Sequence, residues 1–308
     1  MKLLTYALPD APLTEHVGVY IPEKDAILPA AAVGQEAADM NEWIVLLQDS
    51  ALFSKLLETA ERVQDGSDAP ADEHLISSLI PYSKVIRKAP IPHPLQDIMC
   101  LGINYAAHAE ESARYKREAF ERNREYAVYF AKRVDEAVAD GQDIPSHSGL
   151  TSRLDYEVEL AVILGRDAKN VAAADAMDYV FGYTILNDVS ARDLQTRHKQ
   201  WYFGKSLDGF CPMGPWIVTK DEMDPVQGIR SYINGELRQN STTALLMFDI
   251  PQIIEELSSG MTLKAGSIIS TGTPSGVGMG FDPPRFLVSG DIVRCEIDGI
   301  GSLTNTVR

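Results

Sequence analysis

Hydrophobic positions follow two patterns along the chain. They recur at helical spacing between residues 40 and 62, whereas beyond residue 150 they form short runs and alternations broken by glycine and asparagine. Helical spacing predicts an amphipathic helix, and short runs between turn residues predict strands. Further strand-like runs lie at 2–7 and 17–21. The pattern therefore predicts an α+β chain that is mostly β.

Turn and cap residues refine this prediction. Asn234-Gly235 stands between two alternating runs and predicts a β-hairpin. Residues 286–303 predict two more strands, and short helices are expected at 173–179 and at 251–258, the latter with Asp249 as its N-cap. Strands do not alternate regularly with helices, which favours a mainly antiparallel β domain over repeated βαβ units.

A proline-rich segment predicts how the chain is divided. Lys88-Ala-Pro-Ile-Pro-His-Pro places a proline at every second position, which excludes a helix and indicates an extended linker. The short apolar run that follows, at 98–102, predicts a buried strand. We expect a small N-terminal α+β region over 1–90 and a larger domain over 91–308.

Acidic residues stand at alternating positions in one of the most apolar parts of the chain. Asp155, Glu157 and Glu159 would share one face of a strand, and Asp188 follows another apolar run. Carboxylates so close together resist burial unless a cation neutralises them. Without a Cys or His cluster the ligands favour a hard ion, Mg²⁺ first, with Mn²⁺ and Ca²⁺ as alternatives. The competing interpretation is an antiparallel strand with one solvated face.

Charge and composition narrow the class of protein. The chain of 308 residues has 28 basic and 44 acidic side chains, a net charge of -16, which argues against a nucleic-acid partner. No apolar run approaches the ~20 residues that span a bilayer. The three cysteines are widely spaced and indicate buried thiols in a reducing compartment. We expect a cytoplasmic protein with no membrane partner.

Several other polar residues are candidates for chemistry. His108 and Glu111 are three apart, so on a helix they would share one face, where Glu111 could orient the imidazole as a general base; a solvated helix surface is the alternative. Lys132 and Lys205 lie among aromatic residues, which predicts either a lysine facing a bound anion or a snorkelling side chain. The strand at 269–271 runs into a Gly-rich loop that could expose N–H groups to an anion.

Five segments, taken in order, resemble the fumarylacetoacetate hydrolase family over residues 97–307. They are Gly-Ile-Asn-Tyr-Ala-Ala-His-Ala-Glu-Glu, Asp-Tyr-Glu-Val-Glu-Leu-Ala, Asn-Asp-Val-Ser-Ala-Arg-Asp-Leu-Gln, Gly-Lys-Ser-Leu-Asp-Gly-Phe and Thr-Gly-Thr-Pro-Ser-Gly-Val-Gly. The resemblance implies a β-roll of mixed sheets that pairs as a homodimer, and residues 1–90 resemble the variable N-terminal region of bacterial members.

The resemblance also implies roles for individual residues. Asp155 matches a motif position that is not usually a ligand. The stretch between Glu111 and Lys132 is long and highly charged, which implies a larger lid over the site. The implied metal ligands are Glu157, Glu159 and Asp188, the implied catalytic residues are His108, Glu111 and Lys132, and the implied substrate contacts are Gln195, Lys205 and Thr273.

These residues predict chemistry on a 2-oxo acid. A metal held by three carboxylates leaves positions for the carboxylate and keto oxygens, and a nearby lysine would stabilise an enolate. Our first expectation is Mg²⁺-dependent hydrolysis of a C–C bond in a 2,4-dioxo acid of the acylpyruvate or fumarylpyruvate type. Isomerisation of a 2-hydroxy-2,4-dienedioate and decarboxylation of oxaloacetate use the same site and remain open. A non-catalytic metal-binding protein is the remote alternative.

Overall fold

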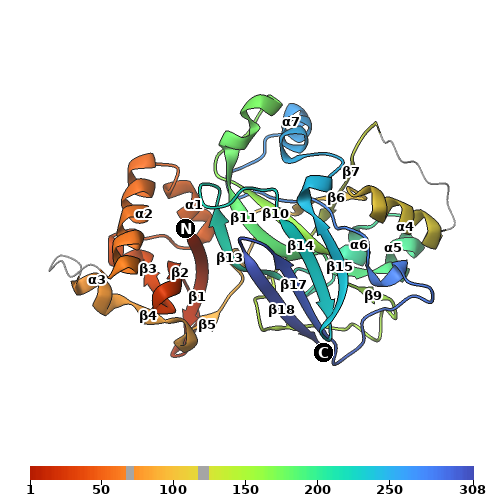
Figure 1. Cartoon of the computed structure of the whole chain (residues 1–308), viewed down its shortest axis with the longest axis horizontal. Helices are drawn as coiled ribbons and strands as arrows, with labels where there is room; N and C mark the ends of the chain where they lie inside the picture. The colour runs from red at the N-terminus through yellow and green to blue at the C-terminus, as the bar shows by residue number, and fades with distance from the viewer. Residues whose placement is uncertain (67–72, 117–124) are drawn as a thin grey trace.

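A large mixed sheet forms the centre of the molecule. The computed structural model describes residues 1–66, 73–116 and 125–308. Within them the sheet has the order β4-β3-β2-β1-β13-β11-β10-β16-β6-β7, with β5 also paired to β1, and only β16 and β6 run parallel (Figure 1). Its strands are β1 (Lys2–Leu8), β2 (Ala11–Ile21), β3 (Ala26–Pro29), β4 (Ile80–Pro81), β5 (Ile86–Arg87), β6 (Ile98–Gly102), β7 (Val128–Lys132), β10 (Val158–Leu164), β11 (Val180–Asn187), β13 (Met213–Thr219) and β16 (Ile268–Ser270).

Two smaller sheets complete the β structure. A five-stranded sheet has the order β15-β14-β17-β18-β8, and a two-stranded sheet pairs β9 with β12. Asn234 and Gly235 have φ of 52° and 83° and join β14 to β15, so the predicted hairpin is confirmed. The strands are β8 (Asp143–Ile144), β9 (Leu154–Asp155), β12 (Ser190–Ala191), β14 (Gly228–Ile233), β15 (Glu236–Thr242), β17 (Ile292–Ile297) and β18 (Gly301–Val307).

The helices lie around these sheets (Figure 1). The single helix expected at 40–62 is two helices, because Leu47 ends the first and the Asp49 side chain caps the second by accepting from two backbone N–H groups. The segment at 173–179 is a 3₁₀ helix, and Asp249 caps the helix after it through a capping box. The α-helices are α1 (Met40–Leu46), α2 (Ser50–Asp65), α3 (Glu73–Ser78), α4 (Ala106–Lys116), α5 (Arg192–His198), α6 (Tyr202–Lys205) and α7 (Ile250–Gly260).

The first 90 residues extend the central sheet. Lys2 and Leu3 pair with Val218 and Ile217 of β13, and α1 and α2 pack on the same hydrophobic core as strands from the larger part of the chain. The predicted boundary near residue 90 stays a prediction. Figure 1 places α1–α3 at one end of the molecule and α4 with α5 at the other, so the N-terminal region lies away from α4.

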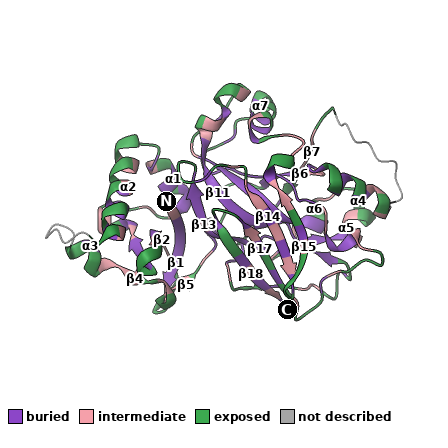
Figure 2. Cartoon of the chain, viewed as in Figure 1, coloured by how far each residue is buried: buried purple, intermediate pink, exposed green. Residues whose placement is uncertain are grey.

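The acidic segment is buried rather than solvated. Every residue of β10 and β11 is buried, as the purple strands at the centre of Figure 2 show. Asp155, Glu157 and Glu159 expose 0%, 4% and 1% of their surface, so the alternative of an exposed antiparallel strand is wrong. Cys100, Cys211 and Cys295 are buried free thiols, as predicted. Within the described residues, none of the helices has the length and apolar character that a bilayer span requires.

Candidate active site

Helix α4 carries one polar stripe into a cavity of about 640 Å³. His108, Ser112 and Tyr115 line this cavity, and their spacing of four and three residues places them on one face of the helix. His108 Nδ1 lies 3.1 Å from Glu111 Oε2, and both residues are buried. The Gly276 N–H donates to Glu111 Oε1 at 3.0 Å. The Gly-rich loop thus fixes the carboxylate that orients the imidazole.

Three carboxylates converge across the cavity from this helix. Glu157, Glu159 and Asp188 each offer an oxygen within 4.8 Å of the other two, and all three are buried. The antiparallel pairing of β10 with β11 brings them together, because Val158 lies opposite Asn187 and the Asp188 N–H donates to the Glu157 carbonyl at 2.8 Å. Glu159 is held from the far side by Ser270 Oγ and the Gly272 N–H.

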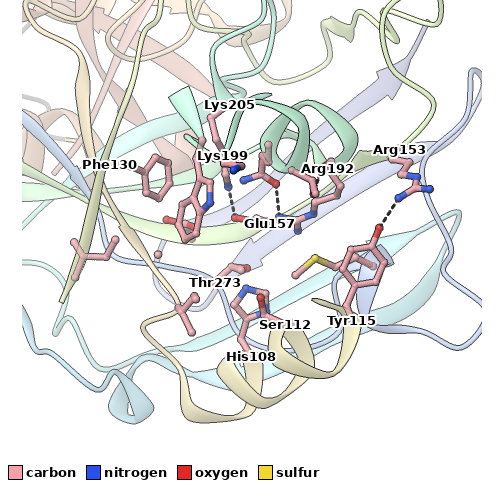
Figure 3. Close-up of a pocket in the computed structure, with 18 residues that line it drawn as sticks. His108, Ser112, Tyr115, Phe130, Arg153, Glu157, Arg192, Lys199, Lys205 and Thr273 are labelled. Atoms are coloured by element: carbon pink, nitrogen blue, oxygen red, sulfur yellow. Dashed lines mark hydrogen bonds and ion pairs between the residues drawn. The ribbon is translucent and has the colours of Figure 1, made fainter. Parts of the chain in front are cut away.

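Three buried bases contact these carboxylates, and Figure 3 shows two of them, Lys205 and Arg192, beside Glu157. Lys205 Nζ donates to Glu157 at 2.7 Å and to Asp188, Lys132 Nζ donates to Asp188 at 2.7 Å, and Arg192 Nη1 lies 2.6 Å from Glu157 Oε1. Burial opposes ionisation of Glu157, but Arg192 and Lys205 outweigh it and hold the pKa of that carboxyl well below its usual value. The site is therefore strongly charged and internally paired.

Glu159 differs from its neighbours in its ionisation. Burial raises its pKa well above the usual value, and the charges of Asp188 and Glu157 raise it further. The three bases thus leave part of the negative charge uncompensated. Because the converging donors are hard oxygens, the residues fit a divalent cation of the Mg²⁺, Mn²⁺ or Ca²⁺ kind. Glu157, Glu159 and Asp188 would hold it.

Asp155 is turned away from this cluster. Its carboxylate accepts from Arg192 Nε at 2.8 Å and from the N–H groups of Gly278 and Met279 at 2.6 and 3.0 Å. Asp155 therefore anchors Arg192 and the Gly-rich loop, and Arg192 in turn bridges Asp155 and Glu157.

The predicted substrate contacts and the predicted catalytic lysine lie in different places. Gln195, Lys205 and Thr273 line the cavity together with Glu157 and Glu159. Lys132, which the resemblance implied as a catalytic residue, does not line it. Its fully buried ammonium donates to Asp188, to the Val189 carbonyl and to the Lys205 carbonyl. Lys132 lies behind Asp188 and acts on the site by holding that carboxylate.

Other lining residues escaped the sequence analysis. Arg192 is 5% exposed, and its Nη2 has no hydrogen-bond partner among the described residues. Arg153 Nη1 donates to Tyr115 Oη at 3.0 Å, and Lys199 also lines the cavity. The helical stripe that begins at His108 could have indicated Tyr115. The expected larger lid includes 117–124, which lie outside the described residues.

Comparison with known proteins places the chain in a family. Residues 97–308 match the model of the fumarylacetoacetate (FAA) hydrolase C-terminal domain. The chain is 44% identical over 264 residues to oxaloacetate tautomerase YisK of Bacillus subtilis, covering 85% of this chain and 86% of that protein.

Solved structures of related proteins match this chain over its whole length. A fumarylacetoacetate hydrolase from Exiguobacterium antarcticum is 35% identical with a TM-score of 0.76, and the match covers 100% of this chain and 99% of that one. Maleylpyruvate hydrolase from Sphingobium sp. SYK-6 is 30% identical with a TM-score of 0.73, with the same two coverages. The predicted β-rich fold and its resemblance are confirmed: the chain belongs to the fumarylacetoacetate hydrolase family.

Proposed function

We propose that the chain is a metal-dependent isomerase that interconverts the keto and enol forms of a 2-oxo acid. The observation that carries this proposal is the buried His108–Glu111 pair, which faces a cavity also lined by Glu157 and Glu159. A proton-transfer group thus stands opposite a site that fits a cation. The 44% identity to an oxaloacetate tautomerase supports the same class of reaction.

The residues divide the work of proton transfer. Because Glu111 accepts from Nδ1, the proton sits on that nitrogen and Nε2 of His108 is left to take a proton from the carbon beside the keto group. When bound, the divalent cation would polarise the keto oxygen as a Lewis acid. Lys205 lies at the same end of the cavity, where its positive charge would favour an enolate oxygen over a neutral ketone. His108 Nε2 then gives the same proton to the enolate oxygen, which forms the enol, and the reverse transfers restore the ketone, so the reaction is balanced without a co-reactant.

A second candidate is hydrolysis of a C–C bond in a 2,4-dioxo acid, the function that the sequence analysis placed first. The same His108–Glu111 pair could take a proton from water instead of carbon, and a cavity of about 640 Å³ has room for a water beside the substrate. The 30% identity to a maleylpyruvate hydrolase supports this alternative. The greater identity to a tautomerase is the reason for placing isomerisation first.

The test is a set of assays on purified protein with Mg²⁺ or with EDTA. The enol absorbance of oxaloacetate reports tautomerisation, release of CO₂ reports decarboxylation, and loss of acetylpyruvate or fumarylpyruvate reports hydrolysis. Tautomerisation that EDTA removes and Mg²⁺ restores would support the proposal. Hydrolysis without tautomerisation would favour the second candidate, and Mg²⁺-independent turnover would contradict both.

We also propose Mg²⁺ as the resident ion and a homodimer as the assembly. Oxygen ligands favour Mg²⁺ over softer ions. Metal analysis of the purified protein and light scattering would test the two statements separately.

A further inference from the structure

The cavity has a second charged end, away from the three carboxylates. Arg153 and Tyr115 lie there, joined by the hydrogen bond from Nη1 to Oη, whereas Lys205 and Phe130 lie toward the other side (Figure 3). His108 and Tyr115 share one face of α4 and are seven residues apart, which corresponds to about 10 Å along the helix axis. A molecule that reaches both ends is therefore elongated.

The pairing of β9 with β12 brings the backbones of two arginines that line the cavity next to each other. Leu154 lies opposite Ala191 in this pairing. The adjacent residues Arg153 and Arg192 are joined by a hydrogen bond, in which the Arg192 N–H donates to the Arg153 carbonyl at 3.0 Å. Residues directly opposite in an antiparallel pair project from the same face, and like charges there are unfavourable. Both arginines line the cavity, so its wall carries one guanidinium group beside Glu157 and another beside Tyr115.

The two guanidinium groups have different partners. Arg192 is buried and paired with Asp155 and Glu157. Arg153 is exposed and lines the cavity, and within the described part of the chain its side chain pairs with the neutral Tyr115 hydroxyl alone. No carboxylate of residues 1–66, 73–116 or 125–308 forms an ion pair with Arg153, and the buried Nη2 of Arg192 has no hydrogen-bond partner there either. An anion bound at this end would meet the Arg153 guanidinium, which no carboxylate of the described residues pairs with.

The charge balance around the buried carboxylates also favours a second anionic group on the ligand. The four buried carboxylates of the site face three buried bases, Lys132, Lys205 and Arg192. A divalent cation would turn this deficit of positive charge into a surplus, which the first carboxylate of a 2-oxo acid would neutralise. The charge of Arg153 is additional to this balance and calls for a second anionic group.

We propose that Arg153 binds a second carboxylate at the far end of the substrate and selects dicarboxylic over monocarboxylic 2-oxo acids. This inference rests on the proposed function, because the keto acid must first occupy the metal end. Tyr115 is a positioning residue: it holds the Arg153 guanidinium from the helix that also carries His108. Binding of the second carboxylate therefore also fixes α4 beside the substrate.

The test compares binding of matched ligands by calorimetry in the presence of Mg²⁺. Oxalate represents the keto-acid end alone, 2-oxoglutarate and 2-oxoadipate add a distal carboxylate, and 2-oxopentanoate and 2-oxohexanoate have the same chain lengths without it. We expect Arg153→Met to weaken binding of the preferred dicarboxylate at least about tenfold, the effect of losing one charge-assisted hydrogen bond. Binding of oxalate and of the monocarboxylates should change less than about twofold.

Two further variants keep the test specific. Tyr115→Phe keeps the ring and removes the hydroxyl, and it should reduce the same preference by a smaller factor. Arg166→Met is the matched control, because Arg166 is an exposed arginine that does not line the cavity, and it should leave every affinity unchanged.

The outcomes separate this inference from the function on which it rests. Wild-type protein that binds oxalate with Mg²⁺ but does not prefer a dicarboxylate at either chain length would overturn the role of Arg153 alone. An equal loss for both ligand classes in Arg153→Met would do the same. Failure of the wild type to bind oxalate with Mg²⁺ would overturn the proposed function and the inference together.

Discussion

Replacing Asp155 by asparagine should destabilise the fold while sparing the proposed metal ligands. The Asp155 carboxylate is completely buried and accepts hydrogen bonds from Arg192 Nε and from the N–H groups of Tyr156, Gly278 and Met279. Asparagine keeps one acceptor oxygen but points an NH₂ group at donors that previously met an oxygen. Of the two carboxylates that pair with the buried Arg192 guanidinium in the described structure, Glu157 alone then remains.

The expected cost follows from these contacts. Removing one partner of a buried ion pair typically costs about 3–5 kcal/mol, because the other charge stays buried. The retained acceptor oxygen and the remaining contact with Glu157 place Asp155→Asn at the lower end, about 3 kcal/mol. A substitution at an exposed pair such as Asp167 with Lys264 should cost less than about 1 kcal/mol.

Urea denaturation followed by tryptophan fluorescence would measure both free energies of unfolding. Asp167→Asn is the matched control, since it makes the same chemical change in an exposed pair. Titration with Mg²⁺ would show whether Asp155→Asn still binds the ion. A variant no less stable than Asp167→Asn, or one that loses Mg²⁺ binding while remaining folded, would refute the reasoning.

Three other predictions concern the site and the thiols. Glu159→Gln should leave the metal-free protein at least as stable as wild type, because burial raises the pKa of Glu159. The same variant should abolish the rise in Tm that Mg²⁺ produces in wild type. An unchanged rise would show that Glu159 is not a metal ligand. Gly280→Ala should lower kcat at least about tenfold, since a Cβ there would overlap the Glu111 carboxylate. Gly260→Ala, which has open space, is its control, and equal activity of the two would contradict the role of Glu111. Burial raises the pKa of Cys211 to about 12. Mass spectrometry should therefore find this thiol unmodified by iodoacetamide at pH 8 in native protein and alkylated after denaturation. Rapid labelling of the native protein would contradict its burial.

Local patterns in the sequence predicted the parts of the site that local structure forms. The alternating acids indicated Glu157 and Glu159, but the strand expected there is interrupted between β9 and β10, so Asp155 does not share their face. The three-residue spacing of His108 and Glu111 predicted their contact on α4. The break between α1 and α2 was also local, since Asp49 is an N-cap residue, and the sequence analysis overlooked it.

Contacts between distant segments could not be predicted in this way. Arg153 meets Arg192 only because β9 pairs with β12, and the register of that pairing has no signal in either segment alone. Lys132 contacts Asp188 although β7 lies four strands from β11 in the sheet order, and no local pattern indicates that contact. Pairing of Lys2 with Val218 spans most of the chain, so the place of the N-terminal strands depends on the complete fold.

The central claim is that His108 transfers a proton at carbon beside the keto group of a 2-oxo acid when a divalent cation is bound. Deuterium exchange at C3 of 2-oxoglutarate in D₂O, followed by NMR, would test it most directly. We predict exchange above the uncatalysed rate with Mg²⁺, no acceleration with EDTA, and loss of most of the acceleration in His108→Gln. Acceleration that persists with EDTA or in His108→Gln would contradict the account.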